Sequence, residues 1–193
     1  MKRMVTAAVL AALVLACGQK AEQRPAQQTQ AQTQTQQQPQ TGKQEPPRPA
    51  IKQSDARVWI DPVTAAKGST AAIKVQYYGV EEAKAIVIPL VVPSGVTIDS
   101  VSYAGSILEF IATRPINIDN DNHRVLFTAI PTTEPNIPAK EGLLGTVYVT
   151  IGPNAESGDI EETFFPPGNY LTYVDTANAL IEPHFQPGKL TVQ

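Results

Sequence analysis

From residue 57 onward, short apolar runs alternate with clusters of Gly, Pro, Asn and Asp. The clearest run is 71–77, where Ile73, Val75 and Tyr77 fall on one side of an extended chain and Lys74 and Gln76 on the other. This period of two is typical of a strand with one buried face. Similar apolar runs cover residues 58–60, 85–92, 96–103, 107–112, 124–130, 143–151, 161–165, 170–174, 180–185 and 189–192. The spacing predicts an all-β domain over residues 55–193, an immunoglobulin-like or jelly-roll β-sandwich.

Glycines and prolines between and within these runs refine the prediction. Gly68 and Gly95 close turn sequences in which a positive φ is expected, and Pro167 with Gly168 fits the centre of a type II turn. Such turns join antiparallel strands, and no amphipathic helix is visible to connect parallel ones. Pro89 interrupts the apolar run 85–92. Because proline has no N–H to donate, we expect a sheet edge or a bulge at that point.

The first 54 residues have a different pattern. A basic start is followed by an apolar stretch too short to span a bilayer, which indicates a secretory signal over residues 1–16. The end of this stretch, VLAC, resembles the lipobox of bacterial lipoproteins, and the resemblance implies that Cys17 carries lipid. Residues 17–54 are dominated by Gln, Pro, Thr and Ala, which predicts a disordered tether. We therefore expect an exported protein anchored to a bacterial membrane through Cys17. Gly18 follows Cys17, which resembles outer-membrane sorting if the host is Gram-negative.

Charge and cysteine content narrow the classes of function. Residues 55–193 contain 8 basic and 16 acidic side chains, and therefore carry a net charge of −8. This balance argues against a nucleic acid as partner, because phosphate binding needs a basic surface. The single Cys excludes an intramolecular disulfide and a cysteine metal site. The domain must therefore be stabilised by its hydrophobic core.

Three stretches of the domain resemble a known family. Residues 61–70 (DPVTAAKGST) lead into the alternating run, and they are followed by 96–105 (VTIDSVSYAG) and 142–149 (GLLGTVYV). Together they resemble cohesin domains. Cohesins are jelly-roll sandwiches that bind dockerin modules, so the resemblance implies a lipid-displayed module for protein–protein interaction, with a dockerin-containing protein as an expected partner.

Catalytic and metal-binding motifs are scarce. The sequence has no nucleophile elbow, phosphate-binding glycine loop or HExxH helix, and nothing brings His123 and His184 together, so no enzyme activity and no cofactor are expected. Asn117, Asp119 and Asp121 alternate oxygen donors as a Ca²⁺ loop does. The closing glutamate and the glycine of an EF-hand are missing, and Asx residues also form turns without metal. We therefore favour a plain loop over a calcium site.

Aromatic residues support an alternative function. Phe165, Tyr170 and Tyr173 flank a Pro-Pro-Gly segment, where an exposed loop would offer rings to a partner or to a sugar. The alternative to the protein-binding module is therefore a carbohydrate-binding lipoprotein. For Trp59, the only tryptophan, a place in the core near the first strand is the favoured interpretation.

Overall fold

A computed structural model describes residues 52–193 of the protein. The predicted signal, Cys17 and the tether up to residue 51 lie outside the described residues. Strand β1 (Lys52–Ile60) begins three residues before the domain start predicted at residue 55. Within residues 52–193, no helix is long and apolar enough to cross a membrane.

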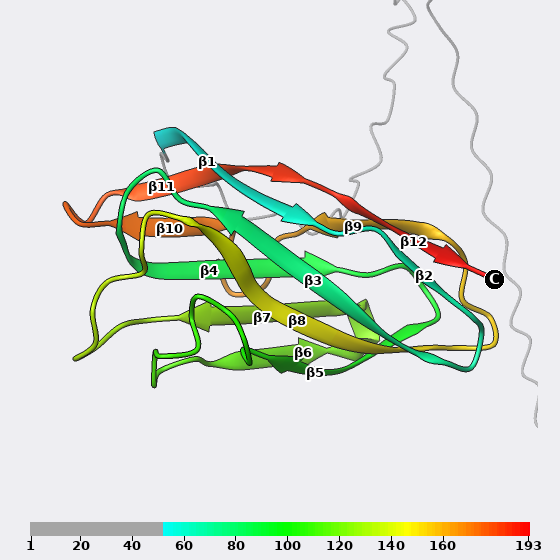
Figure 1. Ribbon diagram of the computed structural model, residues 1–193. Coiled ribbons are helices and arrows are strands. Elements are labelled where there is room, and N and C mark those ends of the chain that lie inside the picture. The colour runs from blue at the N-terminus through cyan, green and yellow to red at the C-terminus, as the bar shows by residue number, and fades with distance from the viewer. Residues whose placement is uncertain (1–51) are drawn as a thin grey trace, which may run out of the picture. The chain divides into compact units, whose positions relative to one another are not determined.

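The strands form the two layers of an open β-sandwich (Figure 1). The first sheet has the order β11 (Leu180–Gln186), β1, β3 (Thr70–Tyr78), β8 (Glu141–Ile151) and β5 (Val96–Ser102). The second sheet has the order β10 (Thr172–Asp175), β4 (Ala83–Val91), β7 (Arg124–Ala129) and β6 (Ile116–Asp119). The layers are joined where β10 pairs with β11. Beside β4 runs β9 (Gly158–Glu162), followed outward by β12 (Gly188–Val192) and β2 (Val63–Ala65).

The core lies between the two sheets and follows the alternation of the strands. Ile73, Val75 and Tyr77 point inward from β3 and are fully buried, whereas Lys74 on the same strand is exposed. From the second sheet, β4 contributes Ile86, Ile88 and Leu90, and β7 contributes Val125 and Phe127. The predicted all-β sandwich is thus confirmed. Phe127 is fully buried, and replacing such a ring by alanine lowers the free energy of unfolding by about 3 to 5 kcal/mol.

One predicted strand is wrong and two strands were missed. Residues 107–112 form consecutive turns instead of a strand, held by backbone bonds such as Ser106 N to Tyr103 O (3.0 Å) and Ile111 N to Leu108 O (3.1 Å). Leu108 and Ile111 are nevertheless fully buried, so these apolar residues fill the core from a loop. The short strands β2 and β6 have no clear apolar alternation, which explains why the pattern did not reveal them.

The antiparallel prediction holds for most pairs but not at the chain ends. β1 pairs with β11 in parallel, and β2 pairs with β12 in parallel. No crossover helix is needed, because the first and last strands of the sandwich meet after the chain has passed through both layers. Gly68 and Gly95 have the predicted positive φ values of 78° and 77°. A Cβ at Gly95 would lie 2.8 Å from Ala155 Cα, so this turn accepts only glycine. Gly168 does not have a positive φ, and the type II turn predicted there is wrong.

Pro89 lies inside the second sheet, not at its edge. On one side β4 pairs with β7 without interruption, with Pro89 opposite Leu126. On the other side the neighbouring strand is broken: β9 ends opposite Leu90 and β10 starts opposite Val87. Thr163 N donates to Pro89 O (3.2 Å), so the missing N–H of Pro89 points to this gap. The interruption that the proline predicts is thus in the adjacent strand, and residues 163–171 leave the sheet there.

Candidate functional site

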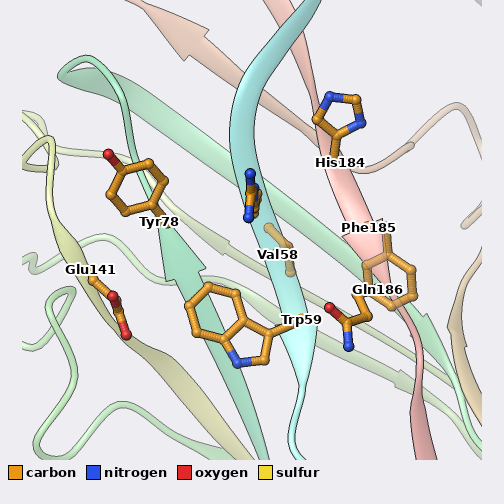
Figure 2. Close-up of a pocket in the computed structure, with 8 residues that line it drawn as sticks. Val58, Trp59, Tyr78, Glu141, His184, Phe185 and Gln186 are labelled. Atoms are coloured by element: carbon orange, nitrogen blue, oxygen red, sulfur yellow. The ribbon is translucent and has the colours of Figure 1, made fainter.

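The outer face of the first sheet is mainly polar. Lys74 and Tyr78 on β3, and Tyr148 on β8, are exposed along it. A groove of about 930 Å³ crosses this face and is lined by Arg57, Trp59, Tyr78, Glu141, His184 and Gln186, among others (Figure 2). Trp59 is half-buried in the groove. The favoured interpretation of Trp59 as a core residue is therefore wrong, because its neighbours Val58 and Ile60 take the inward positions of β1.

The outer face of the second sheet is mainly apolar along β4, with Thr128 of β7 and Thr172 of β10 opposite Val87. The outward positions of β4 are Ala85, Val87, Pro89 and Val91, since the alternate positions Ile86, Ile88 and Leu90 are buried in the core. Across the sheet, Ala85 pairs with Val174 of β10 and Pro89 pairs with Leu126 of β7. We call the half-buried group Ala85, Val87, Leu126 and Val174 the apolar face. An antiparallel sheet with a solvated outer face normally places polar residues there.

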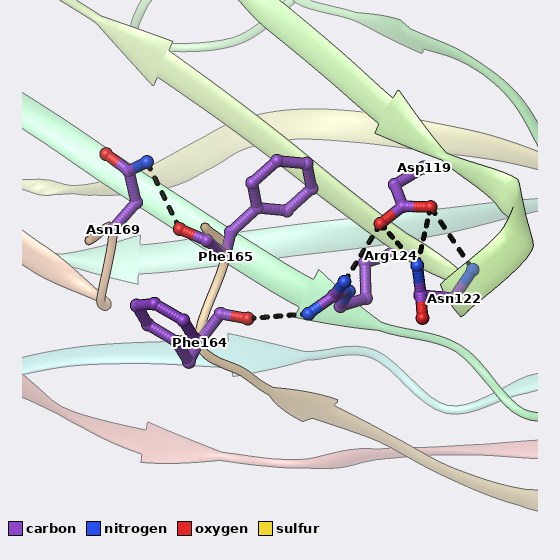
Figure 3. Close-up of polar contacts among 6 residues, drawn as sticks. All are labelled: Asp119, Asn122, Arg124, Phe164, Phe165 and Asn169. Carbon is purple, nitrogen blue, oxygen red and sulfur yellow. Dashed lines mark hydrogen bonds and ion pairs between the residues drawn. The ribbon is translucent and has the colours of Figure 1, made fainter. Parts of the chain in front are cut away.

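The apolar face is flanked by residues 163–171, which link β9 to β10. Arg124 of β7 holds this linker in place: Nη1 donates to Phe164 O (3.2 Å), and the guanidinium lies 5.6 Å from the centre of the Phe165 ring. Nη2 of the same arginine is 2.9 Å from Asp119 Oδ2 (Figure 3). Asn169 N and Nδ2 both donate to Phe165 O. The linker is thus fixed to the edge of the face by both backbone and side-chain contacts.

The three aromatic residues predicted from the sequence to bind a partner are buried. Phe165 is 4% exposed, Tyr170 is 5% exposed and Tyr173 is fully buried. Phe164 packs against Tyr170 with ring centres 5.1 Å apart. Tyr173 Oη donates to Glu81 Oε1 and accepts from the Ser54 hydroxyl, both at 3.0 Å. The expected exposed aromatic loop is therefore not present. These rings hold the linker and the core together, and their contact with a ligand stays a prediction.

The Asx-rich loop satisfies its own polar groups. Asp119 caps the short 3₁₀ helix Asn120–Asn122 by accepting from Asn122 N (3.2 Å), and both of its oxygens also accept from Asn122 Nδ2. The bonds from Asn122, together with Arg124, hold the pKa of Asp119 below its ordinary value. Asn117 and Asp121 are exposed. No group of three or more His, Cys, Asp or Glu side chains in the described part of the chain is arranged to hold a metal ion.

The two histidines lie in different places. His123 follows the 3₁₀ helix with a positive φ of 54° and its Nδ1 is 3.2 Å from Val96 O. His184 lies on β11 and lines the groove of the first sheet. The structure therefore does not bring the two histidines together.

Comparisons with known proteins show which solved structures share the fold of this domain. No protein-family model matches the sequence. A search of curated proteins finds no significant relative. Solved structures, by contrast, match well. A cohesin of Clostridium thermocellum OlpA, solved in complex with a dockerin, superimposes with a TM-score of 0.59 at 14% identity, over 72% of this chain and 100% of that chain.

Two further matches have the same fold in other organisms. The seventh type I cohesin of ScaB from Pseudobacteroides cellulosolvens has a TM-score of 0.57 at 12% identity, over 72% of this chain and 92% of that one. A non-cellulosomal cohesin from the archaeon Archaeoglobus fulgidus has a TM-score of 0.56 at 11% identity, again over 72% and 92%. The domain is cohesin-like. The resemblance that the sequence stretches indicated is thus confirmed at the level of the fold.

The apolar face was not predicted as a site, although its signal was in the sequence. Residues 85–92 are apolar almost without a break, whereas a strand with one wet face would alternate. In this cohesin-like domain, one half of that run fills the core and the other half forms the apolar face.

Proposed function

We propose that the domain is a non-catalytic module that binds a protein partner through the apolar face, and that the partner carries a dockerin-type module. The observation that carries this proposal is the row of outward apolar side chains on β4, β7 and β10. These side chains are half-buried on the outside of the sheet, and an outward-facing apolar sheet face is typical of a surface that another protein covers. Cohesin neighbours of the domain were solved in complex with dockerins, which supports the choice of partner.

The proposal includes display at a membrane. The lipobox-like sequence before Cys17 supports lipid attachment, and residues 18–51 would then separate the domain from the bilayer. A chain of this length with coil dimensions has a span of roughly 30 to 35 Å. For this part of the proposal, Cys17→Ser should move the protein from the membrane fraction to the soluble fraction or stall its processing. Unchanged membrane fractionation of the variant would contradict the anchor.

Two matched alanines test the binding surface. Ala85 lies on the apolar face and Ala72 lies on the outer face of the first sheet. In the full-length protein, Ala85→Glu should weaken binding of a dockerin partner by about 30-fold or more, because an unpaired carboxylate in an interface costs about 2 kcal/mol or more. Ala72→Glu should leave the dissociation constant unchanged.

The measurement is a calorimetric titration with purified dockerin modules. The panel contains those of the source organism and those solved with the cohesins of Clostridium thermocellum and Acetivibrio cellulolyticus. Melting curves of both variants check that the fold is intact. Equal losses in the two variants would move the interface away from the apolar face. Failure of every dockerin to bind the wild-type protein would remove the dockerin assignment.

A further inference from the structure

The groove on the first sheet is built from rows of side chains that cross four strands. One row consists of His184, Arg57, Tyr78 and Glu141, which are direct neighbours in register from β11 through β1 and β3 to β8. In the next row Trp59 of β1 lies beside Gln186 of β11. The groove is therefore a continuous surface across the first sheet, on the side opposite to the apolar face. Its lining includes no residue of the linker 163–171.

The polar side chains of the groove are free to bind. Within residues 52–193, Arg57, Glu141, His184 and Gln186 make no side-chain hydrogen bond or ion pair. The arginine on the outer face of the second sheet, by contrast, has partners within the protein, because Arg124 bonds to Asp119 and to Phe164 O. The groove thus offers donors from Arg57 and Gln186 and acceptors from Glu141 and Gln186 that the protein itself does not satisfy.

Three aromatic residues line the groove, of which Phe185 packs against the core and Trp59 and Tyr78 are the outward ones. Trp59 is half-buried and Tyr78 is 44% exposed. Figure 2 shows both rings lying across the strands with their faces turned in the same direction as the sheet face. Because Arg57 is opposite Tyr78 and Trp59 is opposite Gln76, the two rings are diagonal neighbours on antiparallel strands, a relation that separates residues by about 7 to 8 Å. Flat apolar rings beside free hydrogen-bonding groups match the amphipathic surface of a sugar ring, which has C–H faces and hydroxyl edges.

Charge selects among sugars. In the first row, Arg57 and Glu141 lie on either side of Tyr78 and their charges balance each other, whereas the domain as a whole is acidic. An anionic polymer would be repelled by the net charge of −8 over residues 55–193. A neutral polymer meets no such penalty. The open shape of the groove, on a sheet face and not in a closed cavity, fits a chain that passes across it.

We propose that this groove binds a neutral polysaccharide, with Trp59 and Tyr78 stacking on sugar rings and Arg57, Glu141 and Gln186 bonding to hydroxyls. The site is separate from the proposed protein-binding face and does not depend on it. A displayed module with both surfaces would hold a protein partner on one side and a polysaccharide chain on the other.

The test uses the single tryptophan as its reporter. Because Trp59 is the only tryptophan, the emission of the full-length protein reports on the groove when it is excited at a wavelength that tyrosine does not absorb. Titration with the neutral hexasaccharides of cellulose, xylan, mannan and chitin should shift the emission with at least one of them, and calorimetry should give the same dissociation constant. Tyr78→Ala should weaken that binding about tenfold or more. Tyr148→Ala, which removes an equally exposed tyrosine of the same sheet face outside the groove, should leave it unchanged.

Three results would overturn the proposal. The first is that no hexasaccharide changes the emission or binds at millimolar concentration. The second is that Tyr148→Ala weakens binding as much as Tyr78→Ala does. The third is that the emission responds to a proline-rich peptide and to none of the sugars, since aromatic grooves also bind such peptides. Ala85→Glu should not affect saccharide binding, so failure here and failure of the protein-binding proposal are distinguishable.

Discussion

The two sheets of the sandwich share one core but have opposite outer faces. On the first sheet the outward positions are mainly polar, and the rings of Trp59 and Tyr78 lie in a groove with free hydrogen-bonding groups. On the second sheet the outward positions along β4 are apolar, with Leu126 and Val174 beside them, and Arg124 at its edge is paired with Asp119. A core needs only the inward half of each strand. The outer halves are thus free to differ, and their difference indicates two kinds of ligand.

The same contrast separates residues that hold the domain together from residues that are available to a ligand. Arg124 and Arg57 illustrate it, since both are arginines on outer strand positions. Arg124 joins β7 to the linker and to Asp119, whereas Arg57 makes no bond within residues 52–193. Substitutions at matched positions on the two sheets should therefore have unequal effects on stability.

The largest difference in the free energy of unfolding is expected between variants of the two arginines. Arg124→Ala removes a bond to Phe164 O, the contact with the Phe165 ring and the ion pair with Asp119. The free energy of unfolding should fall by about 2 kcal/mol, because hydrogen bonds from a charged group are worth about 1.5 to 3 kcal/mol. Arg57→Ala should stay within about 0.5 kcal/mol of wild type. Urea unfolding of both variants measures this. Equal stabilities would show that Arg124 does not fix the linker.

A smaller difference is expected between two buried tyrosines that face each other across the core. Tyr173 of the second sheet bonds to Ser54 and Glu81, whereas the buried hydroxyl of Tyr77 from the first sheet has no partner in the described part of the chain. Burial raises the pKa of Tyr77, and the nearby Tyr173 and Glu81 raise it further. Tyr173→Phe should lower the free energy of unfolding by about 1 kcal/mol.

Tyr77→Phe should be neutral or stabilising, because it removes a buried polar atom that makes no bond. Denaturant unfolding of the two variants side by side is the measurement. A loss of stability in Tyr77→Phe as large as that in Tyr173→Phe would mean that the Tyr77 hydroxyl has a bonding partner after all.

The smallest effect on stability is expected for the loop that connects β7 to β8, and it should depend on pH. Glu134 accepts N–H bonds from Ala112, Thr132 and Thr133. These bonds, that of Thr132 foremost, lower the pKa of Glu134 from 4.5 to about 2. A carboxylate whose pKa is lowered in the folded state stabilises the protein at pH values above the pKa of the unfolded chain. For Glu134 this stabilisation is lost as the pH falls from about 4.5 to about 2.

Glu134→Gln should therefore have a lower melting temperature than wild type at pH 6, and the gap should narrow towards pH 2. Glu156→Gln, which changes an exposed carboxylate with no bond within residues 52–193, is the control. A gap that is constant from pH 6 to pH 2 would contradict the role of the Glu134 charge.

Much of the fold could be predicted from the chain, for a clear reason. Alternation such as Ile73, Val75 and Tyr77 against Lys74 depends only on the two-residue period of a strand, so the sequence carries it directly. The turns at Gly68 and Gly95 could likewise be predicted, because positive φ is a local property of glycine. Local rules failed for residues 107–112, where apolar residues serve the core from turns, and at Gly168, whose φ is not positive.

The candidate sites depended on contacts that are distant in sequence. Phe165 and Tyr170 have the composition of a binding loop, yet Arg124, some forty residues earlier in the chain, draws their segment onto the second sheet. Trp59 has the composition of a core residue, yet the pairing of β1 with β3 and β11 turns it outward into the groove. Aromatic residues alone do not reveal which face of a sheet they will occupy.

By itself, the sequence determined the all-β sandwich and its alternation, the acidic charge and the resemblance to cohesins, since these follow from local period and composition. Only the tertiary structure decided which half of the apolar run 85–92 faces outward and which side chains cross four strands to form the groove. The physical reason is that strand register brings together residues more than a hundred positions apart, and only the folded sheets fix that register.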